Sequence, residues 1–333
     1  MRTTLTILTI TALFVSAGCK SSGQPKTTLE EGRELLTVDF QKGQTLQYKF
    51  VSSKDVTIDW DPENKSSGSG RRANDSSTES MEMVVAYTPV EVDPYGSTII
   101  EAKCQTVKVT RTGRSGARSK KDAVEYLKDK TFRISVDPSG KIEDANQLDA
   151  LIKEIGKEPF REDPRQGRIK EPDMIGDFVV TQWFLWDSIS SIENPSQGVS
   201  VDQSWTSQLS VPSPMVMRKA RDVTYTLSEI RPNGQGRLAV IKSVFKPAES
   251  APHSWPIPYS GRFQMAGTFG FLSGYKLLEL QGDGEELFNI NLGRTEQYNH
   301  QYQMKLQAII PMGIAVKPLI TIKQNVSMTR LGS

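Results

Sequence analysis

Short turn sequences between stretches of alternating apolar and polar residues constrain the fold of this chain more than any other feature. Three of them place a Gly two residues after a Pro: Asp93-Pro94-Tyr95-Gly96, Asp137-Pro138-Ser139-Gly140 and Arg231-Pro232-Asn233-Gly234. Pro presets φ for a turn and Gly accepts positive φ, so each sequence predicts a hairpin tip. Asp283-Gly284 predicts a fourth, tight turn. A chain interrupted in this way is expected to form mainly antiparallel sheet.

Two of these turns end a longer shared pattern, which recurs at one constant offset of 138 residues, from Gly96 to Gly234. Reuse of one hairpin sequence would explain the turn residues. Duplication of a β-unit would also explain the residues before the turn, which gain nothing from turn chemistry. Both interpretations stay open. The copies are Tyr87-Thr88-x-x-Glu91-Val92-x-Pro94-x-Gly96 and Tyr225-Thr226-x-x-Glu229-Ile230-x-Pro232-x-Gly234.

Two helices are expected in the middle of the chain. Leu148, Leu151, Ile152 and Ile155 stand at the spacing of one helical face. Asp144 with Gln147 resembles a capping box, and Gly156 fits the position just past the helix. A second helix is expected from a cap at Asp173 to about Ile189, with a stretch at 178–186 that is apolar nearly all round. By contrast, 61–80 has almost no apolar residue and predicts a mobile loop.

The fold class that follows is α+β, predominantly antiparallel β: a large curled sheet or half-barrel with the two central helices packed on it. A duplicated β-unit is one possible origin of that sheet. The expected segments are a signal peptide (1–18), a tether (19–34), a first β-rich unit (35–145), a helical segment (146–195) and a second β-rich unit (196–333).

The aromatic helix is the candidate ligand-binding element. Phe178, Trp183 and Trp186 bring a large apolar area to a short stretch of helix. Laid across the concave face of a curled sheet, these rings either fill it or line a cavity for a hydrophobic ligand. We expect a ligand, if one binds, to contact these three residues.

The N-terminus predicts export. Arg2 is followed by an apolar stretch from Leu5 to Val15 and by the small residues Ser16, Ala17 and Gly18, the three parts of a signal peptide. Cys19 stands directly after the cleavage site. One alternative is an ordinary secretory signal with a chance Cys.

The other interpretation rests on a family resemblance. The segment ending in Ser16-Ala17-Gly18-Cys19 resembles bacterial lipoprotein signals, although Ser16 stands where Leu is usual. The resemblance implies that Cys19 carries diacylglycerol and further acyl chains such as palmitate, and becomes the mature N-terminus. Lys20, which is not Asp, implies the outer membrane, facing the periplasm, in a Gram-negative cell. Two or more acyl chains anchor a protein stably.

Composition excludes several functions. The net charge of +2 is too balanced for a nucleic-acid partner, and only two His occur in the chain. We expect His300 to be a surface residue. No nucleophile elbow or phosphate loop is present, so we expect no enzyme activity, no cofactor and no metal. Alternation places Cys104 in a core, as a structural thiol.

The chain beyond the signal is similar in architecture to uncharacterised β-rich bacterial envelope lipoproteins. That similarity implies no functional residues. We therefore expect a non-catalytic protein, anchored to a membrane through lipid on Cys19, that binds a hydrophobic ligand or a lipidated partner under the aromatic helix. The alternative is a structural or assembly scaffold that contacts other envelope proteins.

Overall fold

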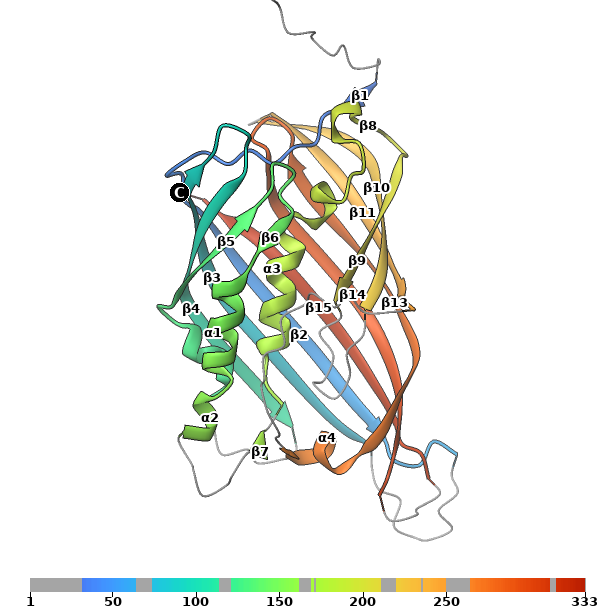
Figure 1. The fold of residues 1–333 in the computed structure, drawn as a ribbon. Coiled ribbons are helices and arrows are strands. Elements are labelled where there is room, and N and C mark those ends of the chain that lie inside the picture. The colour runs from blue at the N-terminus through green and yellow to red at the C-terminus, as the bar shows by residue number, and fades with distance from the viewer. Residues whose placement is uncertain are drawn as a thin grey trace, which may run out of the picture.

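The computed structural model describes residues 32–63, 74–113, 121–161, 169–170, 172–210, 220–234, 236–249, 264–311 and 316–332. Within this part of the chain, eleven strands form one antiparallel sheet (Figure 1). Five strands come from the first half of the chain: β2 (Leu46–Asp59), β3 (Asp75–Val92), β4 (Thr98–Gly113), β5 (Thr131–Val136) and β6 (Ile142–Asp144). Six come from the second half: β9 (Ser204–Ser210), β10 (Ala220–Asn233), β11 (Gly236–Pro247), β13 (Ser273–Asn289), β14 (Arg294–Ile309) and β15 (Leu319–Leu331).

The order of the strands joins the two halves of the chain in the middle of the sheet. It runs β6-β5-β4-β3-β2-β15-β14-β13-β11-β10-β9, so the last strand pairs with β2. The outermost strands β6 and β9 do not pair with each other, and the sheet stays open. Two short pairs lie outside it: β1 (Arg33–Glu34) with β8 (Val199–Ser200), and β7 (Ile169–Lys170) with β12 (Gln264–Met265).

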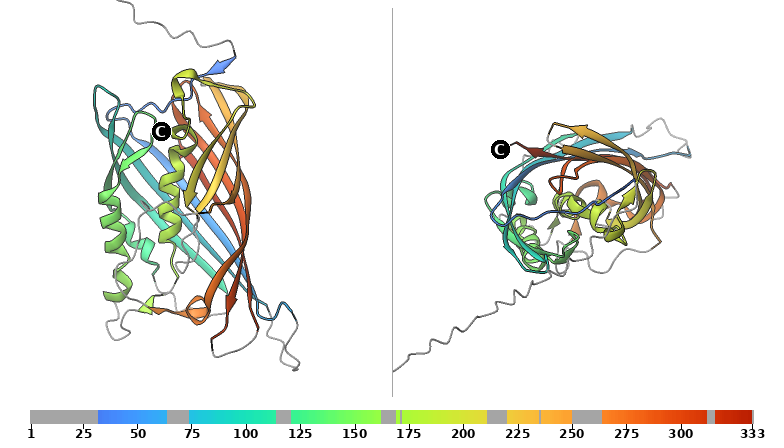
Figure 2. Two further views of the ribbon diagram at one scale, coloured as in Figure 1. Left: turned by 45° about the vertical axis from the view of Figure 1, so that its right-hand side comes forward. Right: turned by 90° about the horizontal axis from the view of Figure 1, so that it is seen from above.

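The helices lie inside the curl of the sheet, as the view from above shows (Figure 2). The main ones are α1 (Asn146–Ile155) and α3 (Ile175–Ser190), both expected from the sequence. Their buried residues share one apolar core with the inward-facing residues of the sheet. The described chain also contains two short helices, α2 (Glu158–Arg161) and α4 (Gly267–Phe271), and two 3-10 turns, at Ala123–Leu127 and Pro195–Gln197.

The predicted helix caps are partly wrong. Ala145, not Asp144, precedes α1, and no side chain caps this helix. The carboxylate of Asp144 instead accepts a hydrogen bond from the Asn146 backbone, while Gln147 accepts one from the Arg133 backbone of β5. Gly156 follows α1 in the right-handed conformation. Asp173 accepts a hydrogen bond from the Ile175 backbone, one residue before the position expected of a cap.

Two of the three Pro-x-Gly sequences, at Gly96 and Gly140, are hairpin tips as predicted and join β3 to β4 and β5 to β6. The third is correct only as a hairpin: Pro232 and Asn233 still belong to β10 and pair with Arg237 and Gly236 of β11, and Gly236, not Gly234, takes positive φ. In the first two, Asp93 and Asp137 each accept hydrogen bonds from backbone N–H groups two and four residues on. Gly96 and Gly140 take φ of 93° and 92°, which favours glycine.

Two expectations about loops are wrong. Asp283-Gly284 lies inside β13, where glycine is needed for close packing: a Cβ on Gly284 would stand 2.7 Å from Ser243 Oγ. Part of 61–80 is strand, because β3 already begins at Asp75 and pairs there with β2. Polar side chains suffice there because one face of the strand is exposed.

The fold is thus predominantly antiparallel β with a large open sheet, as expected. The segments 35–145 and 196–333 contribute to the same sheet, and the tether region contains the short strand Arg33–Glu34. Along the described chain, no helix is both long and apolar enough to cross a membrane.

Candidate functional site

The concave face of the sheet, with α3 lying on it, is the candidate site. This helix has an apolar surface nearly all round, so twelve of its residues are buried. Phe178 packs edge-on against Phe132 of β5, with ring centroids 6.1 Å apart. Trp186 packs against Tyr87 of β3 at 6.0 Å and against Phe40 at 5.4 Å.

The structure therefore brings two of the three predicted ligand-binding residues into the core. Phe178 and Trp186 are buried, and Trp183 is half-buried against the same core. The rings of Phe178 and Trp186 pack on β5 and β3 of the first half, and a ligand there would have to displace them. Ligand binding by Phe178, Trp183 and Trp186 stays a prediction.

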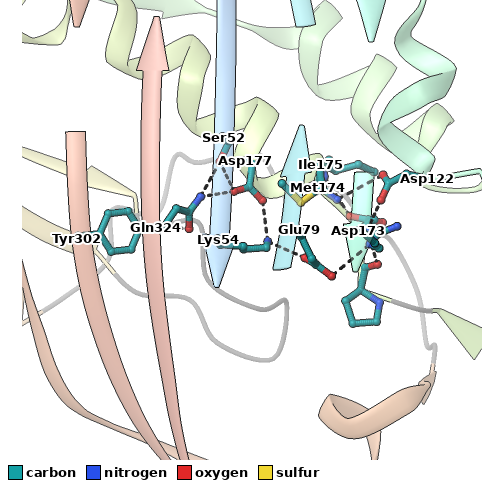
Figure 3. A network of polar contacts seen from close by, with 12 residues as sticks. Ser52, Lys54, Glu79, Asp122, Asp173, Met174, Ile175, Asp177, Tyr302 and Gln324 are labelled. Carbon is teal, nitrogen blue, oxygen red and sulfur yellow. Dashed lines mark hydrogen bonds and ion pairs between the residues drawn. The ribbon is translucent and has the colours of Figure 1, made fainter. Parts of the chain in front are cut away.

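A network of polar contacts attaches the first turn of α3 to the sheet (Figure 3). Asp177, which is buried, accepts hydrogen bonds from Ser52 Oγ at 2.9 Å, Lys54 Nζ at 3.0 Å and the amide of Gln324. A carboxylate here is also favoured by the helix dipole. Burial lowers the pKa of Lys54, but the carboxylates of Asp177 and Glu79 outweigh this and raise it. The network is thus an anchor in which the charges are paired.

Farther along α3, two tyrosines of the sheet bind it from opposite sides. The Tyr87 hydroxyl donates to Gln182 Oε1 at 2.6 Å. The Tyr225 hydroxyl donates to Asp187 Oδ2 at 2.7 Å, and Ser207 donates to the other oxygen of that carboxylate at 2.9 Å. Burial raises the pKa of Asp187 to about 6, although both hydrogen bonds oppose the change.

The second half of the concave face holds a buried positive charge. Arg221 of β10 is 0% exposed, and its guanidinium carbon lies 4.0 Å from the centroid of the Phe245 ring, 4.5 Å from that of Phe184 and 5.3 Å from that of Tyr302. Among the residues that the structure describes, none is a hydrogen-bond partner of its three guanidinium nitrogens. Burial accordingly lowers the pKa of Arg221. We call Arg221, Ser243, His300 and the three rings the Arg221 cluster.

The other polar members of the Arg221 cluster also lack partners. Ser243 Oγ and His300 Nδ1 are buried without a hydrogen bond. His300 stacks on Phe184, with centroids 5.2 Å apart, and burial together with the charge of Arg221 lowers its pKa to about 3. The prediction of a surface His300 is wrong. His300 lies two residues from both Tyr298 and Tyr302, which face inward, so all three are on the same face of β14. This spacing could have predicted a buried His300.

Next to the cluster lies a buried acid that the sequence analysis missed. Glu286 of β13 accepts a hydrogen bond from Thr295 Oγ1 at 2.7 Å. Burial is the main cause that raises its pKa to about 7. In the described chain, no three His, Cys, Asp or Glu side chains gather in a way that would hold a metal ion.

A groove of about 830 Å³ crosses five neighbouring strands of the sheet. Exposed side chains line it, such as Gln281, Lys323 and Asn325, together with the buried rings of Phe245 and Tyr302. The groove and the Arg221 cluster therefore share these two rings.

Comparison with known proteins gives no family. No family model and no curated protein matches the chain. Among solved structures, it is similar to a lipovitellin studied for its lipid–protein interactions, at 9% identity and a TM-score of 0.42, over 88% of this chain and 26% of that one. It is also similar to the outer membrane protein OprG from Pseudomonas aeruginosa, at 8% identity and a TM-score of 0.17, over 89% of this chain and 100% of that one. The chain thus spans about a quarter of the lipovitellin chain, and neither likeness is close enough to support an inference.

Proposed function

We propose that this protein is a non-catalytic, lipid-anchored envelope protein that binds an apolar ligand between α3 and the concave face of the sheet. The observation that carries this proposal is the set of buried polar groups without partners in an otherwise apolar, aromatic layer. Native cores satisfy more than about nine in ten such groups. Here Tyr48 Oη, Tyr298 Oη, Ser243 Oγ and His300 Nδ1 all lack a hydrogen bond.

The proposed movement is a separation of α3 from the second half of the sheet. The first turn of α3 is held by the ion pair of Asp177 with Lys54 of β2 and by a hydrogen bond from the Gln324 amide of β15, so it stays in place. Its last turns are held by Asp187, whose partners Tyr225 and Ser207 are neutral, and by the Trp205 indole, which donates to the Ser188 carbonyl. The helix therefore moves at its C-terminal end, above β9 to β14, when a ligand enters.

An uncharged apolar fluorophore, N-phenyl-1-naphthylamine, tests the binding. The test uses residues 20–333 exported behind a non-lipoprotein signal, since the described fold begins after residue 31. We expect its fluorescence to increase in a saturable way when it binds. Phe184→Trp should weaken this binding, because it enlarges a ring on the moving end of α3. The exposed Tyr95→Trp is the matched control. Absence of saturable binding would end the proposal.

The lipid anchor rests on Cys19, which lies outside the described residues. Cells fed an alkyne fatty acid should label the wild type and the Cys104→Ala variant but not Cys19→Ala. Cys104 is the appropriate control because it is fully buried and its burial raises the pKa of the thiol to about 12. Label that persists in Cys19→Ala would contradict the anchor.

A second candidate function is an assembly scaffold. Three exposed apolar residues lie on α4, β13 and β14: Phe271, Leu278 and Ile309. Ile309 pairs with Ser273, two residues after Phe271. A photo-crosslinking residue at Leu278 should then capture one reproducible protein in cells, and the same residue at Tyr95 should not. Equal capture at both positions would contradict a specific contact.

A further inference from the structure

Arg221 is a buried charge without a counterpart in the structure. The guanidinium stays protonated in proteins and carries five N–H donors in one plane. Aromatic faces attract this cation, but they do not replace the hydrogen-bond acceptors that its N–H groups need. Buried charges are ordinarily paired. The chemistry that Arg221 lacks is therefore an oxyanion that accepts two parallel N–H bonds.

Nearby carboxylates do not supply that oxyanion. The charge of Asp187 is close enough to raise the pKa of Arg221. The two oxygens of Asp187, however, accept hydrogen bonds from Tyr225 and Ser207. Glu286 accepts one from Thr295. Among the described residues, no ion pair joins Arg221 to either acid. Ser243 Oγ and His300 Nδ1 of the Arg221 cluster are further unpaired groups that an anionic group would satisfy.

The first half of the sheet shows that the fold itself does not require this arginine. β3 and β10 carry the repeated Tyr-Thr pattern, and the offset of 138 residues that relates Tyr87 to Tyr225 also relates Met83 to Arg221. Both positions are fully buried and face α3's side of the sheet. The residue paired with Tyr87 is Ala102, whereas the residue paired with Tyr225 is Ser243. At these two positions, Arg221 and Ser243 of the second half thus stand where the first half has Met83 and Ala102.

We propose that Arg221 binds the anionic head group of an amphipathic ligand, with Ser243 and His300 as neighbouring contacts, and that the ligand's apolar chain lies beneath α3. This inference rests on the proposed function and specifies its ligand class: a long-chain carboxylate or phosphate monoester. Phe184 covers the guanidinium from α3, while Phe245 belongs to the sheet. The head group therefore reaches Arg221 when the C-terminal end of α3 separates from the sheet.

Three C16 ligands test the proposal by displacement of N-phenyl-1-naphthylamine from residues 20–333: palmitic acid, hexadecyl phosphate and uncharged hexadecanol. We expect at least one of the two anions to bind the wild type about tenfold or more tighter than the alcohol, since hydrogen bonds to charged groups are strong. The anion that binds better identifies the head group. Arg221→Met, which installs the residue of the other half, should abolish the preference and leave hexadecanol unchanged.

Controls separate binding from structure. Arg231→Gln, on the same strand but exposed, should keep the preference. Thermal unfolding of Arg221→Met should occur at the same or a higher temperature than that of wild type, because a buried unpaired charge is removed. If the alcohol binds as tightly as both anions, or if Arg221→Met retains the preference, the head-group assignment is wrong and the proposed function stands. If none of the three ligands displaces the probe from the wild type, the proposed function itself is wrong.

Discussion

The two halves of the sheet are built alike around the repeated Tyr-Thr pattern. Tyr87 and Tyr225 each face inward and donate a hydrogen bond to α3. The following Thr residues each share a hydrogen bond of 2.7 Å with another hydroxyl: Thr88 with Thr45, just before β2, and Thr226 with Ser204 of β9. A bulge lies at the same place in each half, between Pro89 and Glu91 and between Leu227 and Glu229. This agreement outside the turn residues favours duplication of a β-unit over reuse of a hairpin sequence.

The halves differ in what the repeated positions carry. In the first half, Tyr87 meets a neutral amide and Met83 and Ala102 complete an apolar core. In the second half, Tyr225 meets a carboxylate, and Arg221 and Ser243 remain without partners. The same backbone therefore serves as packed core on one side and as proposed binding surface on the other. Four predictions test that difference.

The largest effect is expected at the anchor in the first half. Asp177→Ala leaves Lys54 buried with only Glu79 beside it. Removal of one partner of a buried ion pair costs about 3–5 kcal/mol, and urea unfolding should show a loss of this size. Asp222→Ala, at an exposed carboxylate of β10, is the control. A loss below about 1 kcal/mol would mean that the anchor does not hold α3.

Two phenylalanines of α3 compare the halves directly. Phe178→Ala removes a ring packed on Phe132 and should cost about 3–4 kcal/mol of unfolding free energy. Phe184→Ala removes a ring that covers Arg221 and lets water reach the guanidinium, so it should cost about half as much. Equal losses in urea unfolding would show that the second half is packed core as well.

Glu286 makes the second half sensitive to pH. Its pKa is about 7 in the fold and 4.5 when unfolded. The stability it contributes is therefore present below about pH 4.5 and is lost as the pH rises through 7. Glu286→Gln should gain stability relative to wild type over that range, by about 3 kcal/mol. A difference that stays constant from pH 4.5 to 8 would contradict this.

The smallest effect compares the two tyrosines. Tyr87→Phe should cost about 1 kcal/mol at every pH, because Gln182 is neutral. Tyr225→Phe should cost about 2 kcal/mol above pH 6, where Asp187 is charged, and less below it. Urea unfolding of both variants at pH 5 and pH 8 measures these losses. If the loss caused by Tyr225→Phe changes with pH no more than that caused by Tyr87→Phe, the proposed electrostatic difference between the halves is wrong.

Much of the fold followed from local rules. The hairpin tips, the long alternating strands and the boundaries of α3 depend on turn chemistry and periodicity, which the sequence carries directly. The merging of 273–289 into one strand did not follow, because Gly282 and Gly284 are required by contacts with Gln301 and Ser243 on neighbouring strands. Such contacts are set by the tertiary arrangement.

The candidate site was predictable only in part. Hydrophobicity identified α3 through Phe178 and Trp186. These rings pack against the first half of the sheet, away from the Arg221 cluster. Arg221 and His300 are not expected inside from residue type alone, because charged and polar strand residues usually face solvent. Arg221, however, is two and four residues before the inward-facing Val223 and Tyr225, so the period of two along β10 predicts that it also faces inward.

The most direct test is mass spectrometry of an organic extract of the protein purified from its own cells. Wild type should release about one long-chain acidic amphiphile per chain, whereas Arg221→Met, purified in the same way, should release none above background. An extract without any amphiphile, or the same acidic molecule at the same ratio from both proteins, would contradict a ligand site at Arg221 beneath α3.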